Sequence, residues 1–154
     1  MSKLKFQSLA GMHDILPEDQ VYFQKVHKSV ENIANYYSFQ KIETPILEDA
    51  EVFSKAVGIA TDIVEKEMYT FRTKGGDLVS LRPEGTAAIM RSYLEHGMHN
   101  LPQPVKLWYI GPFFRYERPQ AGRFRQFHQF GFEALGEKNS SVDGQIIQMS
   151  YDVL

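Results

Sequence analysis

The sequence contains no cysteine, which excludes disulfide-stapled folds and zinc sites built from thiolates. It also contains no apolar run near the roughly 20 residues that span a bilayer, and its first residues lack the apolar core of a signal peptide. The formal net charge is -2, whereas a dedicated nucleic-acid binder is normally strongly basic. This net charge is still compatible with a local basic patch. We therefore expect a cytoplasmic protein with no membrane association.

Two classes of ligand site are also missing from the sequence. The segments KGGD and GTAAIM are too short and too poor in glycine to form a phosphate-cradling P-loop. The histidines show no metal-ligand spacing, because Gly97 marks a helix end between His96 and His99. What remains is a chain of 154 residues, 43% hydrophobic and 23% charged, which is enough for one compact unit with an ordinary core.

Helical spacing of apolar residues begins early in the chain. It predicts a first helix over residues 14–37, with Pro17 near its first turn and Val26, Val30, Ile33 and Tyr37 on its apolar side. A short second helix is expected over residues 52–57, with Gly58 as its stop.

Two further helices are predicted in the second half of the chain. One covers residues 83–97, with Thr86 as its cap and Gly97 as its stop. The other covers residues 143–154, with Asp143 as its cap, and it has no stop signal. Because the chain ends inside this apolar pattern, we expect the sequence to belong to a longer protein.

The predicted strands lie between these helices. Residues 38–53 begin extended, and the strand should end or lie at a sheet edge at Pro45, which cannot donate a ladder hydrogen bond. Residues 68–82 alternate around Gly75 and Gly76, which predicts a hairpin. Two long strands follow, residues 104–117 and 124–135, with Trp108 in the core. The predicted fold class is α+β, an antiparallel sheet flanked by helices.

Alternation sorts the side chains of the second long strand into two faces. One face is mostly aromatic and suits packing beneath the sheet; it consists of Phe124, Gln126, His128, Phe130 and Phe132. The opposite face carries Arg125, Phe127, Gln129, Gly131 and Glu133. We expect Gly131 to leave an open space in which a ligand can approach the backbone.

The first long strand places Phe113, Arg115 and Glu117 on one face. If this face coincides with the polar face of the second strand, a guanidinium, an aromatic ring, an amide and carboxylates line one concave surface. That inventory fits a nucleotide together with an amino acid. An ordinary half-solvated sheet face shows the same alternation, so the pattern alone leaves both interpretations open.

Four segments, in order, resemble the class II aminoacyl-tRNA synthetases, and specifically the bacterial-type histidyl-tRNA synthetases. GMHDILPED is similar to the family's opening segment, and FQKIETPILEDAEVF is similar to its motif 1. LRPEGTAAIMRSYLEHG resembles the amino-acid-binding segment, and FRYERPQAGRFRQFHQFGFEALG resembles motif 2. Each motif alone is degenerate, but the four in this order and spacing cover nearly the whole chain.

The resemblance implies roles for individual residues. Arg115 would contact the α-phosphate of ATP and the amino-acid carboxylate, and it is the implied catalytic residue. Glu117 would hold the adenine amino group, Phe127 would stack on the adenine, and Arg123 would meet the γ-phosphate. The implied histidine-binding residues are Glu84, Thr86, Gln129 and Glu133. Without the resemblance, Arg82 and Glu84 can be read as a simple ion pair beside Pro83.

The implied reaction activates histidine with ATP and magnesium to histidyl-adenylate and then transfers the histidyl group to tRNA(His). The family also forms homodimers through motif 1. Motif 3, the histidine-specific segment and the anticodon-binding domain have no counterpart in residues 1–154, so we expect an N-terminal portion of the catalytic domain that is inactive alone. Two alternatives remain: the regulatory subunit of ATP phosphoribosyltransferase, a synthetase-like paralogue, and a binding fragment without catalysis.

Overall fold

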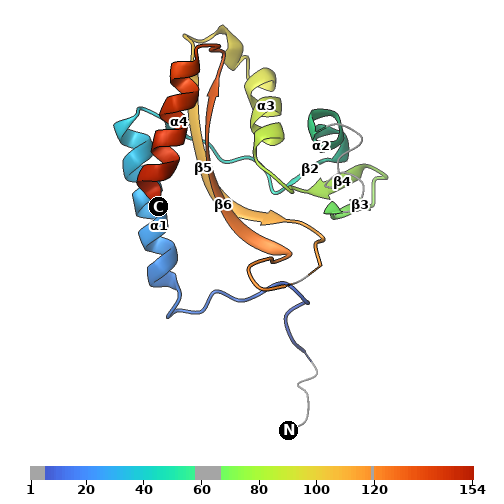
Figure 1. The fold of residues 1–154 in the computed structure, drawn as a ribbon. Coiled ribbons are helices and arrows are strands. Elements are labelled where there is room, and N and C mark those ends of the chain that lie inside the picture. Colours follow the sequence, from blue (N-terminus) through green and yellow to red (C-terminus); the bar gives the residue numbers. More distant parts are fainter. Residues whose placement is uncertain (1–5, 58–66, 119) are drawn as a thin grey trace.

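The structure is a computed structural model that describes residues 6–57, 67–118 and 120–154 (Figure 1). The helices are α1 (Gln20–Tyr36), α2 (Ala50–Val57), α3 (Thr86–Glu95) and α4 (Ser140–Val153), with a 3-10 turn, η2 (Met98–Asn100). The strands are β1 (Gln40–Lys41), β2 (Leu47–Asp49), β3 (Thr70–Arg72), β4 (Leu78–Leu81), β5 (Val105–Phe114) and β6 (Gln126–Leu135). In the part of the chain described, no helix is both long and apolar enough to cross a bilayer.

The α+β class is confirmed, but the strands form two small sheets instead of one antiparallel sheet. In the first sheet, with the order β1-β5-β6, β1 runs parallel to β5 and β6 runs antiparallel to it. The second sheet has the order β2-β4-β3 and is antiparallel throughout. The chain changes sheets around Pro45, and β1 and β2 each lie at a sheet edge, as predicted for this segment.

The β5–β6 hairpin is the long, curved centre of the molecule (Figure 1). Its ten paired positions place Phe113 opposite Phe127 and Tyr109 opposite Gly131, so the odd-numbered residues of both strands share one face. The two faces therefore coincide over the paired residues, which is the condition that a shared ligand surface requires. Both strands are shorter than predicted, and Arg115 follows the end of β5, although its N–H still donates to the carbonyl of Arg125 at 3.0 Å.

The even-numbered face of the hairpin packs against α1 and α4, which lie together on one side of it (Figure 1). This core consists of Val30, Ala34, Phe39, Trp108, Phe132 and Met149. Trp108 is 2% exposed, which confirms its predicted core position. On the opposite face, Ile89 of α3 packs against Leu107, Tyr109 and Phe113. The rest of that face carries the candidate site.

The first two helices differ from prediction mainly at their starts. α1 begins at Gln20, and of its predicted apolar residues Val30 is buried while Val26 is 44% exposed. α2 begins at Ala50, where the carboxylate of Asp49 accepts the N–H of Glu51 at 2.8 Å. The predicted stop at Gly58 lies outside the described residues.

The predicted cap of α3 is wrong. Thr86 is the first residue of the helix, and Glu84 supplies the acceptors: its two carboxylate oxygens accept the N–H groups of Thr86 at 2.6 Å and Ala87 at 3.0 Å. A carboxylate at this position also interacts favourably with the positive end of the helix. The predicted stop is confirmed, since Gly97 has a φ of 65°, in the left-handed region that favours glycine.

The predicted cap of α4 is also wrong. The helix starts at Ser140, three residues before Asp143, because Asn139 has an extended backbone and its Oδ1 accepts the N–H of Ser141 at 3.0 Å. Asp143 instead lies in the first turn, where its charge favours the helix.

The β3–β4 hairpin is confirmed, with a φ of 96° at Gly76 in its turn. However, its strands do not bury their apolar residues and expose their polar ones, because Ser80 is fully buried while Phe71 is 47% exposed.

Candidate active site

Four predicted contact residues gather where the β5–β6 hairpin opens into its loop. We call Arg115, Glu117, Arg123 and Phe127 the loop cluster. The guanidinium carbon of Arg115 lies 5.3 Å from the centre of the Phe127 ring. Glu117 lies between two arginines, 3.9 Å from Nη1 of Arg115 and 3.8 Å from Nη1 of Arg123. The cluster lines a hollow of about 640 Å³ together with Glu67, Gly122, Phe124 and His128.

The arginines of the loop cluster keep donors available for a ligand. Their distances to Glu117 exceed hydrogen-bond length, so the carboxylate attracts both guanidinium groups without saturating them. Within the described residues, the side chain of Arg115 makes one hydrogen bond, from Nε to the carbonyl of Pro83 at 2.9 Å. Its terminal nitrogens therefore remain free to bind phosphate or carboxylate oxygens beside an aromatic ring.

The backbone of residues 82–84 holds the end of β5 in place beneath this cluster. The carbonyl of Arg82 accepts the N–H of Phe114 at 3.0 Å, and the carbonyl of Pro83 accepts from Arg115. The Arg82 guanidinium, 6% exposed, donates from Nε to the carbonyl of Pro112 at 3.0 Å and from Nη1 to that of Thr44 at 2.8 Å. These contacts fix the position from which Arg115 leaves the strand.

Arg82 is a residue whose role the sequence did not reveal. Read locally, it suggests an ion pair with Glu84, but Arg82 reaches carbonyls far away in the chain and Glu84 holds the start of α3. The Arg82 side chain also stacks over Phe113, with 4.5 Å from guanidinium carbon to ring centre. Burial lowers the pKa of Arg82 from its ordinary value, and the nearby Glu43, Tyr109 and Glu48 partly oppose this.

A second group of predicted residues lies further along the same face. We call Glu84, Thr86, Gln129 and Glu133 the acidic cluster. The hydroxyl of Thr86 donates to Oε1 of Glu133 at 2.8 Å, which links α3 to β6. Burial raises the pKa of Glu133 above its usual value, and the neighbouring Glu84 carboxylate raises it further, while the Thr86 hydrogen bond opposes the rise. Two carboxylates in a partly buried space favour a cationic ligand group.

The expected open space at Gly131 is wrong, because the ring of Tyr109 fills it. A Cβ atom at Gly131 would lie 2.5 Å from the Tyr109 ring, and one at Gly85 would lie 2.4 Å from the same ring. The Tyr109 hydroxyl accepts a hydrogen bond from Nε2 of Gln129 at 2.9 Å. Tyr109 is thus a further residue of this site, and its only signal in the sequence is its parity with Phe113 and Arg115.

The two clusters lie along one strand face. Phe127, Gln129, Gly131 and Glu133 follow one another on the odd-numbered side of β6. Six residues of strand span about 20 Å, so the clusters are suited to two ligand groups arranged end to end. Arg115 and Arg123 mark the end suited to an anion, and Glu84 and Glu133 mark the end suited to a cation.

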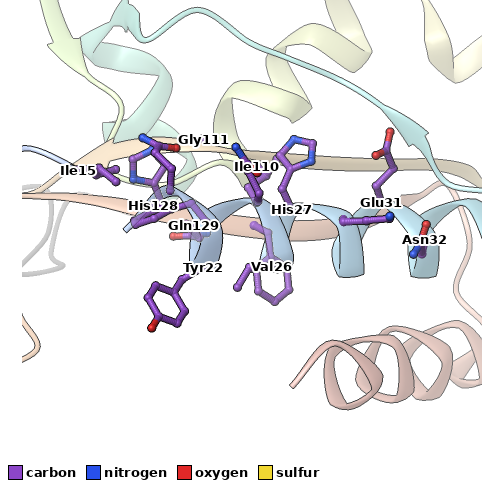
Figure 2. A pocket seen from close by; sticks show the side chains of 15 residues that line it. Ile15, Tyr22, Val26, His27, Glu31, Asn32, Ile110, Gly111, His128 and Gln129 are labelled. Atoms are coloured by element: carbon purple, nitrogen blue, oxygen red, sulfur yellow. The ribbon is translucent and has the colours of Figure 1, made fainter. Parts of the chain in front are cut away.

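A larger hollow of about 870 Å³ lies on the other face of the hairpin, between α1 and the two long strands (Figure 2). Its lining includes Tyr22, Val26, Ile110, His128 and Phe130. The even-numbered face was predicted to pack beneath the sheet. This is confirmed for Phe132, which lies in the core, but it is wrong near the loop, where His128 is exposed. Apart from Gln129, none of the predicted contact residues lines this hollow, so we do not assign the ligands to it.

Known proteins match both the sequence and the fold. The histidyl-tRNA synthetase family profile matches residues 11–154. A histidine–tRNA ligase from Dehalococcoides mccartyi is 56% identical over 95% of this chain and 35% of its own length. The crystal structure of apo Staphylococcus aureus histidyl-tRNA synthetase superposes with a TM-score of 0.80 at 40% identity, covering 96% of this chain and 34% of that one.

A Bacillus halodurans structure described as an ATP phosphoribosyltransferase regulatory subunit/histidyl-tRNA synthetase also has a TM-score of 0.80, at 27% identity, covering 99% of this chain and 38% of that one.

These matches identify the fold as part of a class II aminoacyl-tRNA synthetase catalytic domain. Within that class, the chain belongs to the histidyl-tRNA synthetase family, and it corresponds to an N-terminal portion of the family's enzymes. It spans about a third of the length of the relatives that it matches.

Proposed function

We propose that the protein carrying residues 1–154 is a histidine–tRNA ligase. The observation that carries this proposal is the placement of the loop cluster and the acidic cluster on one face of the β5–β6 hairpin. The 56% identity to a protein named histidine–tRNA ligase supports it. The substrates are ATP, delivered as its magnesium complex, then histidine and tRNA(His).

ATP would bind at the loop cluster. Phe127 is proposed to stack on the adenine, and Glu117 to accept a hydrogen bond from the adenine amino group. Arg123, whose side chain is 65% exposed, is free to turn toward the γ-phosphate. Arg115 would meet the α-phosphate, since its backbone N–H is held by the carbonyl of Arg125, its Nε is held by the carbonyl of Pro83, and its terminal nitrogens are free.

Histidine would bind at the acidic cluster. Oε1 of Glu133 already accepts from Thr86, which leaves Oε2 to accept an N–H of the imidazole ring. Gln129, Thr86 and the Glu84 carboxylate are proposed to surround the α-ammonium group. A site that bonds polar atoms of its ligand in this way rejects isosteres lacking them, because its own buried groups would be left unpaired.

The proposed chemistry follows from this arrangement. A carboxylate oxygen of histidine attacks the α-phosphorus of ATP, the bond to the bridging oxygen breaks, and pyrophosphate leaves with histidyl-adenylate remaining. Arg115 would stabilise the negative charge that increases on the α-phosphate oxygens during the attack. In the second step a hydroxyl at the 3′ end of tRNA(His) attacks the histidyl carbonyl and releases AMP.

We also propose that the protein forms a homodimer through the motif 1 region, residues 39–53. The supporting observation is that both short strands of this region lie at sheet edges, where their outer backbone groups are available to another chain. The molar mass of the full gene product in solution tests this proposal, and a monomer at micromolar concentration would contradict it.

Histidine-dependent exchange between ATP and pyrophosphate, measured on the full gene product, tests the proposed function. Exchange that requires histidine and no other amino acid is the expected result. The absence of exchange with every amino acid would favour the regulatory-subunit function named for the Bacillus halodurans relative. That alternative is weaker, because the arginines, the carboxylate and the ring that would contact ATP all stand in the loop cluster.

Glu133→Gln should weaken histidine more than ATP. Glutamine retains the acceptor for Thr86 but loses the charge that would attract the imidazole, and a hydrogen bond to a charged group contributes about 1.5–3 kcal/mol. We expect the KM for histidine in the exchange assay to rise about 10- to 100-fold, with a smaller change in the KM for ATP. Glu51→Gln, which neutralises an exposed carboxylate, is the control. Equal weakening of both substrates would remove Glu133 from this role.

The same variant should stabilise the unliganded protein at neutral pH. Because burial raises the pKa of Glu133, its contribution to stability is present at low pH, where it is protonated, and is lost as the pH rises through the folded-state pKa. Glutamine cannot ionise, so the variant should unfold at a higher temperature than the parent at pH 7. The difference should shrink as the pH falls. A lower unfolding temperature for the variant at pH 7 would contradict this prediction.

A further inference from the structure

Tyr109 occupies a slot between two glycines beneath the acidic cluster. The side chain is buried, with 8% of the residue exposed, and it points to the odd-numbered face of β5. Its ring lies so close to Gly85 and Gly131 that a Cβ atom at either position would be within 2.5 Å of it. The backbone just before α3 and the backbone of β6 therefore leave the ring little freedom to move.

The hydroxyl of this ring is hydrogen-bonded to one side-chain amide of the acidic cluster. Nε2 of Gln129 donates to the Tyr109 hydroxyl, which leaves Oε1 of the amide unpaired within the described residues. Burial raises the pKa of Tyr109 to about 12, with a further contribution from Glu133, so the phenol remains neutral at physiological pH. A neutral hydroxyl accepts from the amide without adding charge to the cluster.

We propose that Tyr109 is a positioning residue that fixes Gln129 with its amide oxygen available to the α-ammonium group of the amino-acid substrate. This inference rests on the proposed function and extends it to a residue beneath the contact residues. A glutamine side chain that is free to rotate also presents its NH₂ donors, which repel an ammonium group, so the tyrosine would favour the productive orientation. Tyr109 acts through Gln129 and needs no contact with the substrate.

Tyr109→Phe tests the role of the hydroxyl, because it keeps the ring between Gly85 and Gly131. Tyr93→Phe is a matched control: Tyr93 is also 8% exposed, and its hydroxyl also bonds a glutamine side chain, Gln103 at 3.2 Å, outside either cluster. In the full gene product we expect the KM for histidine to rise about three- to tenfold in Tyr109→Phe, as for loss of one neutral hydrogen bond. The KM for ATP and kcat should stay close to the parent values.

Two histidine analogues separate this positioning role from a general loosening of the fold. Histidinol keeps the ammonium group, and imidazolepropionate lacks it. Tyr109→Phe should weaken inhibition by histidinol about as much as it raises the KM for histidine, and it should leave inhibition by imidazolepropionate unchanged. Equal weakening of both inhibitors would overturn the inference, as would identical behaviour of the Tyr109→Phe and Tyr93→Phe variants.

A double-mutant cycle tests the route through Gln129. If Tyr109 acts by orienting this amide, Tyr109→Phe should have no further effect on the KM for histidine in a Gln129→Ala background. Additive effects would show that Tyr109 acts by another route and would overturn the inference while the ligase function stands. A parent protein without histidine-dependent exchange would remove the proposed function, and the inference with it.

Discussion

Replacing Arg115 with alanine should reduce histidine-dependent ATP–pyrophosphate exchange by about 10²- to 10³-fold, because loss of one preorganised charge-stabilising donor costs about 2.7–4 kcal/mol in the transition state. The side chain makes a single hydrogen bond within the described residues, to the carbonyl of Pro83. Its removal should therefore leave the fold intact. The loss should fall mainly on kcat, since the phosphate charge that Arg115 would stabilise increases only during the reaction.

Arg72→Ala is the matched control for this variant. It also removes one arginine, from the β3–β4 hairpin, where the guanidinium donates to the carbonyl of Gly76 at 2.9 Å. Both variants change the net charge equally, so a general electrostatic effect would lower exchange in both. Exchange by Arg115→Ala within about twofold of the control would show that the ATP site has been placed wrongly, given the size of effect expected for a residue of this kind.

Arg82→Ala should destabilise the protein by about 3–6 kcal/mol, because each of two hydrogen bonds from a charged donor contributes about 1.5–3 kcal/mol. The carbonyls of Pro112 and Thr44 would lose these donors beside a buried side chain. The variant should also lose exchange activity in the protein that remains folded, because the segment that positions Arg115 would relax. Chemical denaturation of the full gene product measures the first effect.

Two companion variants identify the cause of this loss. Arg82→Met keeps much of the side-chain volume and removes the donors, so it should be nearly as unstable as Arg82→Ala. Arg82→Lys keeps the charge, but a single ammonium group cannot reproduce the planar fork of donors, and an intermediate loss is expected. A stable Arg82→Met variant would show that the residue fills space instead of holding the two carbonyls.

The sequence could predict that several candidate-site side chains share one strand face, because strand geometry is regular. Once Phe113 and Phe127 are placed on strands, parity alone puts Gln129 and Glu133 on their face, and the register confirms it. Arg115 lies just beyond the paired residues, and its N–H still bonds the carbonyl of Arg125. The roles proposed for these residues, by contrast, came from resemblance to a known family. Alternation of polar and apolar residues is equally compatible with an ordinary solvated sheet face.

The features that sequence reasoning missed depend on contacts between distant segments. Gly131 suggested an open space, and only the neighbouring strand shows that the Tyr109 ring fills it. Arg82 suggested a local ion pair, yet its partners are the carbonyls of Pro112 and Thr44. Such pairings become visible only when the sheets are assembled.

The helix caps failed for a different reason. Thr86 and Asp143 are both good capping residues, but Glu84 and Asn139 lie closer to the first free N–H groups of their helices. Several candidate caps within four residues compete, and propensity alone does not choose among them.

The parallel pairing of β1 with β5 has a consequence for synthesis of the chain on the ribosome. Residues 40–41 lie at one edge of a sheet whose far edge is completed only at Leu135. At about 5–20 residues per second, that interval takes about 5–20 s. During this time the sheet against which α1 packs is incomplete, and part of the apolar side of α1 faces solvent or whatever chaperone meets the nascent chain. α1 is thus made before the sheet that covers it and, we expect, is docked among the last of these elements.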